Sequence, residues 1–194
     1  RDGKQTKVLY DPKNPQRRGR STDPGTWSDY EKAEAAATLP GVAGIGFCFN
    51  GDGLIGVDFD HVRNPETGLI DGDAWQEIRA LGSYTEVSPS GTGVHVLCRG
   101  KIPGDKHRTG PREMYESGRY FTVTGKHVPG TRGIITDSQP GIDTLYKKWF
   151  PQQDRPTAAP AQPAASPPVR LEDDQVIDRL MNAANGDKFT KLMQ

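Results

Sequence analysis

Residues 54–60, LIGVDFD, are the most informative segment of the chain for predicting its fold. Apolar side chains at positions 55, 57 and 59 alternate with Gly56, Asp58 and Asp60, which is the two-residue period of a β-strand. One face of this strand is therefore apolar and packs against a core, while the other face carries both carboxylates. We expect the chemistry of the chain to centre on that second face.

Asp58 and Asp60 place two negative charges close together on one strand face. Like charges at this spacing repel each other, and a bound divalent cation removes the repulsion. Oxygen-only ligands of this kind suit Mg²⁺ or Mn²⁺. A solvated strand end is the alternative interpretation, because residues 61–68 read as a loop.

The segments around this strand predict an α+β fold, with a mostly antiparallel sheet as the core and flanking helices. Residues 29–39 predict a helix capped by Ser28, with Glu31 completing a capping box. The NGDG turn at residues 50–53 predicts a hairpin between a strand at 44–49 and the strand at 54–60. The other predicted elements are helices at 71–81 and 141–150 and strands at 84–88, 94–99, 112–116 and 119–124, the last two joined by a turn at 117–118.

Composition divides the chain into three parts. Residues 1–150 have the composition of one catalytic domain, whose first 25 residues read as extended and loop-like. Residues 151–168 contain six prolines and many alanines, which predicts a semi-rigid linker. Residues 169–194 predict short helices with few core residues, as at the start of a truncated helical domain.

Charge is segregated along the chain although it sums to zero. Residues 52–77 carry seven acidic and one basic side chain, whereas residues 98–133 carry eight basic and three acidic ones. An acidic centre beside basic segments suits metal ions that lie next to phosphates.

Cysteine usage and hydropathy narrow the class of protein. Cys48 and Cys98 lie in apolar, strand-like runs and predict buried thiols rather than a disulfide. No apolar run approaches the ~18 residues that span a bilayer, and the first residues show no signal-peptide pattern. These features predict a cytoplasmic protein without a membrane partner.

A second motif, SPSGTGVH at residues 88–95, is a loop of small residues that leads into a strand. Such a loop can present backbone N–H groups to phosphate, and two side chains on one face of the strand add polar donors. An ordinary hairpin with a structural histidine is the alternative. The residues predicted to bind a nucleotide here are Ser88, Ser90, Gly91, Gly93, His95 and Arg99.

A third motif, REMYESGRYFTVTG, occupies residues 112–125. Strand alternation puts Glu113 and Glu116 on opposite faces, so only one of them can join the aspartates. We choose Glu113, which would complete a three-carboxylate site for two metal ions. Arg119 is predicted to bind phosphate or template, and Tyr120 to stack on a base or sugar, unless both are packed strand residues.

These three motifs, in this order, resemble the catalytic motifs of the archaeo-eukaryotic primase superfamily. The resemblance is greatest to the bifunctional DNA primase-polymerase domains of phages, prophages and plasmids, and it extends over residues 1 to about 150, including the segment TWS at 26–28. It implies that Asp58 and Asp60 are metal ligands, that Ser90 and His95 contact the incoming triphosphate, and that Tyr120 crowds the ribose 2′-hydroxyl. Many members carry Asp where this chain has Glu113.

The resemblance implies a DNA-directed nucleotidyltransferase that transfers dNTP or NTP units to a 3′-hydroxyl on a single-stranded DNA template. It would use two Mg²⁺ or Mn²⁺ ions, with Asp58, Asp60, Glu113 and His95 as catalytic residues. A helicase domain would follow in the same full-length chain. Priming versus extension, and dNTP versus NTP, are left open. The residues predicted to bind DNA are Arg17, Arg18, Arg20, Lys101, Lys106 and Arg108.

Two other classes of function fit the same residues. A metal-dependent nuclease also uses paired carboxylates with a nearby histidine, and it would cut strands without nucleotides. A non-catalytic module that binds single-stranded DNA or an origin would bind DNA regardless of dNTPs and Mn²⁺. The sequence motifs favour the nucleotidyltransferase because all three occur together in order.

Overall fold

The computed structural model describes residues 7–151 of the chain. The predicted linker, beyond its first residue, and the predicted C-terminal helices lie outside these residues. The elements of the described part are β1 (Tyr10–Asp11), β2 (Asn14–Arg18), the 3-10 helix η1 (Pro24–Thr26), α1 (Tyr30–Ala37), β3 (Ile45–Asn50), β4 (Leu54–Phe59), α2 (Gly72–Leu81), β5 (Tyr84–Val87), β6 (Val94–Arg99), β7 (Arg108–Thr109), β8 (Arg112–Tyr115), β9 (Ser117–Val123) and α3 (Gln139–Trp149).

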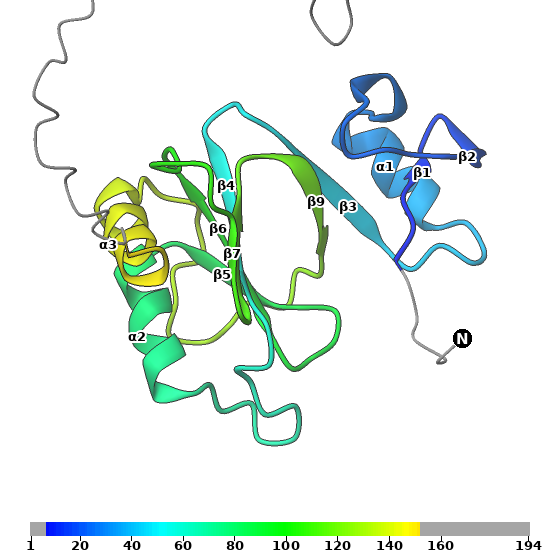
Figure 1. The fold of residues 1–194 in the computed structure, drawn as a ribbon. Coiled ribbons are helices and arrows are strands. Elements are labelled where there is room, and N and C mark those ends of the chain that lie inside the picture. Colours follow the sequence, from blue (N-terminus) through cyan, green and yellow to red (C-terminus); the bar gives the residue numbers. More distant parts are fainter. Residues whose placement is uncertain (1–6, 152–194) are drawn as a thin grey trace, which may run out of the picture. The chain divides into compact units, whose positions relative to one another are not determined.

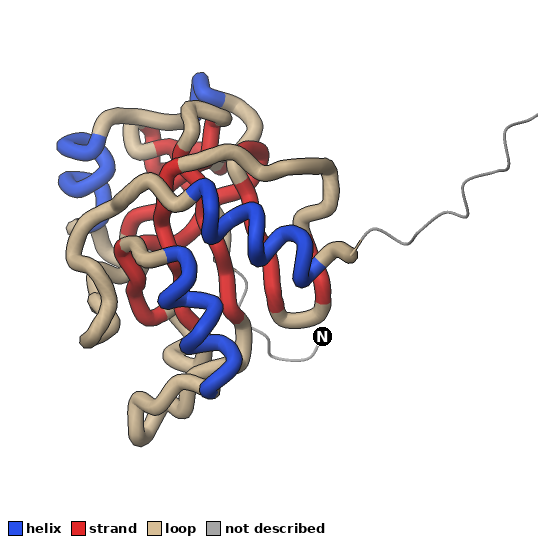
Figure 2. The backbone as a smooth tube through the Cα atoms, turned by 90° about the vertical axis from the view of Figure 1, so that its left-hand side faces the viewer, coloured by secondary structure: helices blue, strands red, loops and turns tan. Residues whose placement is uncertain are grey.

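A five-stranded sheet in the order β5-β6-β4-β8-β7 forms the centre of the fold, and all four of its pairings are antiparallel. Helices α2 and α3 lie side by side on one face of this sheet (Figures 1 and 2). A two-stranded sheet of β3 and β9 lies on the other face (Figure 1). The α+β prediction is confirmed, with three sheets in the described residues instead of one.

The apolar face of β4 packs against the helices, as the alternation predicts. Ile55, Val57 and Phe59 are fully buried, and the cluster that they join includes Ile78 of α2 and Ile142 of α3. Burying an aliphatic or aromatic side chain of this size contributes about 1.5–3 kcal/mol. The helical layer therefore holds β4 in place from behind.

A buried carboxylate joins three elements on this helical side. Glu77 of α2 accepts hydrogen bonds from Arg112 of β8 at 2.9 Å and from Trp149 of α3 at 3.2 Å, and Lys148 Nζ lies 2.8 Å away. Burial alone would raise the pKa of Glu77, but the bonds from Lys148, Arg112 and Trp149 outweigh it and lower that pKa. The strand that carries Glu113 is thus anchored from the helical side.

The predicted hairpin between β3 and β4 is wrong. β3 pairs with β9 instead, in a register that places Phe47 opposite Phe121. Both edges of β4 are already occupied, by β6 on one side and β8 on the other. The predicted turn at 117–118 is also wrong, because these residues begin β9, which lies in a different sheet from β8.

Gly56 lets the small sheet approach the large one closely. A Cβ atom at Gly56 would lie 2.2 Å from Phe49 Cζ and 2.5 Å from Phe121 Cε2. The two phenylalanine rings meet edge to face with centroids 5.0 Å apart. They form a second core with Leu97 and Tyr115, on the same sheet face as the carboxylate of Asp58.

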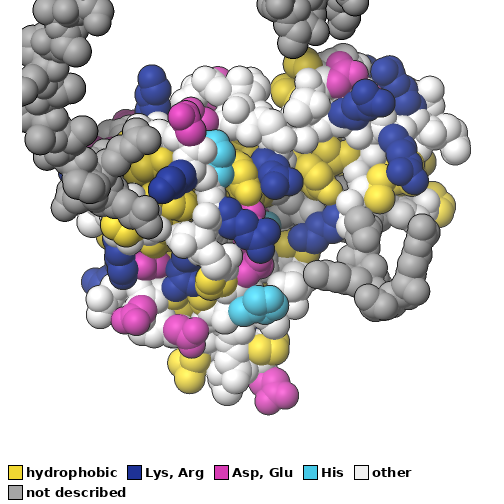
Figure 3. Space-filling model, viewed as in Figure 1, with side chains coloured by type: hydrophobic (Ala, Val, Ile, Leu, Met, Phe, Trp, Pro, Cys, Tyr) yellow, Lys and Arg dark blue, Asp and Glu magenta, His cyan; other side chains and the backbone are white. Residues whose placement is uncertain are grey.

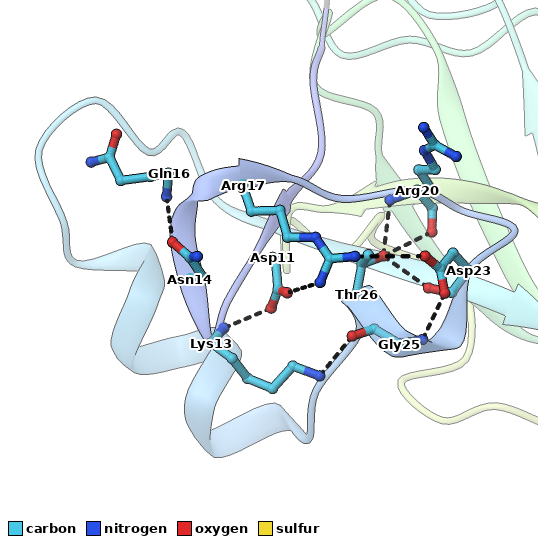
Figure 4. A network of polar contacts seen from close by, with 9 residues as sticks. All are labelled: Asp11, Lys13, Asn14, Gln16, Arg17, Arg20, Asp23, Gly25 and Thr26. Carbon is cyan, nitrogen blue, oxygen red and sulfur yellow. Dashed lines mark hydrogen bonds and ion pairs between the residues drawn. The ribbon is translucent and has the colours of Figure 1, made fainter.

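The N-terminal part has more structure than the sequence predicted. Residues expected to be loop-like include the β1–β2 hairpin, and a polar network joins this hairpin to residues 20–26 (Figure 4). Asp11 accepts a hydrogen bond from the backbone N–H of Lys13 at 2.9 Å and pairs with Arg17 at 3.7 Å. Local side-chain contacts, rather than an apolar period, hold this part together, so pattern analysis did not detect it.

Helix α1 begins one residue later than predicted. Its N-cap is Asp29, whose side chain accepts a hydrogen bond from Lys32 N at 3.0 Å. Ser28 instead donates to the backbone carbonyl of Asp29 at 3.1 Å. The predicted cap was wrong because either residue type can cap a helix and the sequence does not choose between neighbours.

The other predicted elements are present within one or two residues of their expected ends. Helix α2 ends at Gly82, which adopts the left-handed conformation of a helix C-cap with φ 57°. Cys98 is buried as expected, Cys48 is half-buried, and both are free thiols. Among the described helices, none has the length and apolar character needed to cross a membrane.

We expect Gly56→Ala to destabilise the fold by about 1–3 kcal/mol, because the new methyl group would overlap two buried phenylalanine rings. Urea unfolding monitored by tryptophan fluorescence measures the difference. Gly133→Ala is the matched control, since a Cβ atom there meets nothing within 4 Å. Equal midpoints for the two variants would contradict the close packing of the two sheets.

Candidate active site

A row of charged and polar residues crosses all five strands of the large sheet. Glu86 of β5 lies opposite His95 of β6, and His95 lies opposite Asp58 of β4. Asp58 in turn lies opposite Glu113 of β8, which lies opposite Arg108 of β7. Directly opposed residues share a sheet face with Cβ atoms about 4.5–5.5 Å apart. We call these five residues the polar row.

The middle of the polar row opens into a pocket of about 200 Å³. On the face drawn in Figure 3, Lys and Arg side chains gather around the middle, with acidic side chains beside them. The pocket therefore combines carboxylates with several basic groups. Its charged and tyrosine lining residues are Lys7, Asp58, His95, Glu113, Tyr115, Arg119 and Tyr120.

Asp58 lies at the centre of the row with one-fifth of its side chain exposed. The pKa of Asp58 is raised to about 6, chiefly by burial; Asp60 and Glu113 add to the rise, while His95 and Lys7 oppose it. Its buried Oδ1 atom has no hydrogen-bond partner within the described residues. A carboxylate oxygen in this condition is suited to a cation, so Asp58 fits the predicted role of a metal ligand.

His95 is buried between two carboxylates. Its Nε2 atom lies 3.8 Å from Asp58 Oδ1, and its Nδ1 atom lies 3.6 Å from Glu86 Oε1. The ring also stacks on Phe121 with centroids 4.5 Å apart. Glu86 was not among the predicted site residues. The alternation of residues 84–88 does put it on the same strand face as Tyr84.

Glu113, rather than Glu116, lies beside Asp58. Its Oε2 atom accepts a hydrogen bond from the Tyr115 hydroxyl at 2.8 Å, and its Oε1 atom lies 3.0 Å from Arg108 Nε. Glu116 instead accepts a hydrogen bond from the backbone of Ile102 at 3.0 Å and does not line the pocket. Of the two glutamates, Glu113 is thus the one beside Asp58, and its role as the third acid stays a prediction.

Asp60 lies just beyond the end of β4, beside the loop at residues 88–93. A Cβ atom at Gly93 would lie 3.4 Å from the Cα atom of Asp60, so the loop packs closely there. In that loop the hydroxyls of Ser88, Ser90 and Thr92 form a chain with spacings of 3.0 and 3.1 Å. Asp60 does not line the pocket that holds Asp58.

The acidic side chains do not converge on one point. Within residues 7–151, no group of three or more His, Cys, Asp or Glu side chains is placed to hold a metal ion. Asp58 and Glu113 are nevertheless neighbours in the sheet, and Asp60 and Glu113 act electrostatically on Asp58. The donor set suits Mg²⁺ or Mn²⁺, and small side-chain movements would have to bring the three together.

Of two residues predicted to contact the nucleotide, one lines the pocket and the other does not. Tyr120 lines the pocket, and its hydroxyl donates to the backbone carbonyl of Lys7 at 3.1 Å. Arg99 is exposed at the opposite end of β6, paired with Leu54, and does not line the pocket. Lys7 was missed because it lies in the N-terminal stretch that the sequence analysis read as loop.

The residues predicted to bind DNA are all exposed. Arg17 pairs with Asp11 and with Asp23, at 3.7 and 4.0 Å, which gives it a structural role in the N-terminal network (Figure 4). Arg108 pairs with Glu113 at the end of the polar row. The remaining four predicted contacts are Arg18, Arg20, Lys101 and Lys106, all available on the surface.

Comparison with known proteins shows one clear similarity. No family model matches the sequence. The chain is 39% identical, over 136 residues, to the DNA primase-polymerase of Nitratiruptor phage NrS-1. The similar region covers 66% of this chain and 19% of that phage protein.

We expect Asp58→Asn to stabilise the metal-free fold above neutral pH. Because the pKa of Asp58 is raised to about 6 from 3.8, ionisation costs more in the folded state than in the unfolded chain. The contribution of this group to stability is therefore present below pH ~4 and is lost as the pH rises through ~6. At pH ~8 the variant should gain about 1–3 kcal/mol in the free energy of unfolding.

Urea unfolding in the presence of a chelator, at pH ~4 and pH ~8, measures this gain. Asp52→Asn is the control, because Asp52 lies exposed in the turn before β4. An Asp58→Asn variant that is less stable than the parent at the higher pH would show that Asp58 is a satisfied structural residue.

Proposed function

Because the chain is 39% identical over 136 residues to a phage DNA primase-polymerase, we propose that it catalyses template-dependent nucleotidyl transfer on single-stranded DNA. The observation that carries the proposal is the polar row, in which Asp58 lies between His95 and Glu113 across three hydrogen-bonded strands. The reaction transfers a nucleotide from a dNTP or NTP to a 3′-hydroxyl and releases pyrophosphate. The proposal includes initiation without a primer.

The three carboxylates are the proposed ligands of two divalent cations. Asp58 brings an unpartnered oxygen, and Glu113 is directed at the same pocket by Tyr115. Asp60 lies just after β4, beside the small-residue loop. Bound there, Mg²⁺ or Mn²⁺ would neutralise phosphate charge and lower the pKa of the attacking hydroxyl.

The basic and polar groups around the pocket are the proposed nucleotide contacts. Arg119 packs over the Tyr115 ring, with its guanidinium carbon 4.9 Å from the centroid, and lines the pocket with His95. Both can neutralise triphosphate charge as the substrate enters. Tyr120 is held by Lys7 at the pocket wall, where its ring can contact the sugar or base.

We propose that the exposed basic residues bind the template backbone. Lys101 and Lys106 follow β6, and Arg18 and Arg20 lie in and just after β2. Contacts of this kind supply affinity without base specificity and weaken as salt rises. The similar region covers only 19% of the phage relative. We propose that this catalytic core belongs to a longer chain that also carries a helicase domain.

Incorporation of labelled nucleotides tests the proposed activity. The 194-residue chain is incubated with single-stranded DNA, dNTPs or NTPs, and Mg²⁺ or Mn²⁺, with and without a primer. We expect labelled products that disappear in the Asp58→Ala, Asp60→Ala double variant, because the cations lose two ligands. Products without a primer would establish priming.

Two matched glutamates sharpen this test. Glu113→Gln should lower incorporation at least ~100-fold, because it removes a proposed metal ligand. Glu116→Gln is the control, since Glu116 accepts a hydrogen bond from the backbone of Ile102 and does not line the pocket. Equal activity of both variants would overturn the assigned site. Strand cutting without nucleotides would instead support a nuclease.

We expect Lys101→Ala, Lys106→Ala to weaken template binding uniformly across sequences. Loss of two phosphate contacts should reduce the slope of log K against log salt by ~1.4, at ~0.7 per contact for a single strand. Fluorescence anisotropy at several salt concentrations measures the slope. Lys32→Ala is the control, because Lys32 of helix α1 pairs with the N-cap residue Asp29. An unchanged slope in the double variant would show that Lys101 and Lys106 do not contact the template.

A further inference from the structure

Glu86 is a buried carboxylate at the end of the polar row, and the proposed mechanism does not use it. Only 1% of its surface is exposed, and it does not line the pocket. Its position in the row is nevertheless directly opposite His95, whose ring does line the pocket. A charged group buried next to a pocket residue can act on that residue without touching the substrate.

The carboxylate of Glu86 is held in one orientation. Oε1 accepts a hydrogen bond from Thr124 N at 3.0 Å, and Oε2 accepts one from Gly125 N at 3.0 Å. The Tyr84 hydroxyl also donates to Oε2, at 3.1 Å. A backbone donor on each oxygen, with a partly buried hydroxyl as a second donor to Oε2, leaves the group little freedom to rotate.

This fixed carboxylate faces the inner edge of the His95 ring. Glu86 Oε1 lies 3.6 Å from His95 Nδ1, and that nitrogen has no hydrogen-bond partner within the described residues. The other ring nitrogen faces Asp58, and Phe121 covers one ring face. The Glu86 carboxylate therefore favours the ring orientation in which Nδ1 faces β5. In this orientation Nε2 faces Asp58 and the pocket.

We infer that Glu86 is a positioning residue that holds the His95 ring so that Nε2 faces Asp58 and the pocket. This inference rests on the proposed function, because it assigns the ring a task in binding the nucleotide. The partner group on a buried histidine commonly sets its orientation, and buried carboxylates are well suited to do so. Glu86 acts through His95 and contacts no substrate.

A purely structural role for Glu86 is the competing explanation. Its bonds to Thr124 and Gly125 join β5 to the segment that follows β9. Glu77 provides a matched comparison, since it is also a buried glutamate with several polar partners, but it lies on the helical side of the sheet. Loss of either carboxylate should lower stability, whereas only loss of Glu86 should change nucleotide use.

A double-mutant cycle separates the positioning role of Glu86 from a purely structural one. Glu86→Gln should lower kcat/KM for the nucleotide ~10-fold when His95 is present, and less than ~2-fold in the His95→Ala background. Glu77→Gln should lower the melting temperature and leave kcat/KM within ~2-fold of the parent. Effects of Glu86→Gln and His95→Ala that multiply in the double variant would overturn the inference, as would an unchanged kcat/KM.

Two further measurements keep the inference testable. If Glu86→Gln does not fold, Tyr84→Phe replaces it, because it removes one bond that holds Glu86 and keeps the charge. Its smaller loss of kcat/KM should again vanish in the His95→Ala background, and a loss that persists there would overturn the inference.

A readout that does not need catalysis distinguishes failure of the inference from failure of the proposed function. Crystal structures of the parent and of Glu86→Gln, or of Tyr84→Phe if Gln does not fold, would show the His95 ring directly. We expect the ring to leave its position opposite Asp58 in the variant, or to occupy two orientations. A ring that stays in place would overturn the inference even if the chain incorporates no nucleotides.

Discussion

The absence of a side chain at Gly56 is the constraint on which the rest of the structure depends. Only a residue without Cβ allows Phe49 and Phe121 to lie against the middle of β4. The small β3–β9 sheet can then cover the carboxylate face of the large sheet, which would otherwise be open to water. That cover gives Asp58 its low exposure and gives the pocket its wall of Tyr120 and Phe121.

Glu77 and Asp58, which lie on opposite faces of the large sheet, are in opposite electrostatic conditions. On the helical side, Glu77 is satisfied by Arg112, Lys148 and Trp149, and its pKa is lowered. On the pocket side, Asp58 has an unpartnered oxygen and a pKa raised to about 6. Unsatisfied charge of this kind costs stability, and its occurrence in a pocket points to a functional group rather than a structural one.

Individual strands and helices could be predicted from the sequence, but their pairing could not. Period-two alternation correctly predicted β4 and β6, and helical signals correctly predicted α2 and α3. The hairpin at residues 50–53 was wrong, because a turn motif describes local geometry and not which strand edge is free. At the site, alternation showed that only one of Glu113 and Glu116 could lie beside the aspartates, whereas no sequence motif marked Glu86 or Lys7.

The amino-acid pattern of β4 was enough to assign its side chains to the two sheet faces, because side-chain direction in a strand alternates from one residue to the next. The sequence by itself also determined the α+β class and the order of the three acidic and histidine motifs. Only the tertiary structure decided that Glu86, His95, Asp58 and Glu113 stand in one row. Strand register depends on contacts between segments dozens of residues apart, and such contacts form through packing and free sheet edges rather than through local sequence.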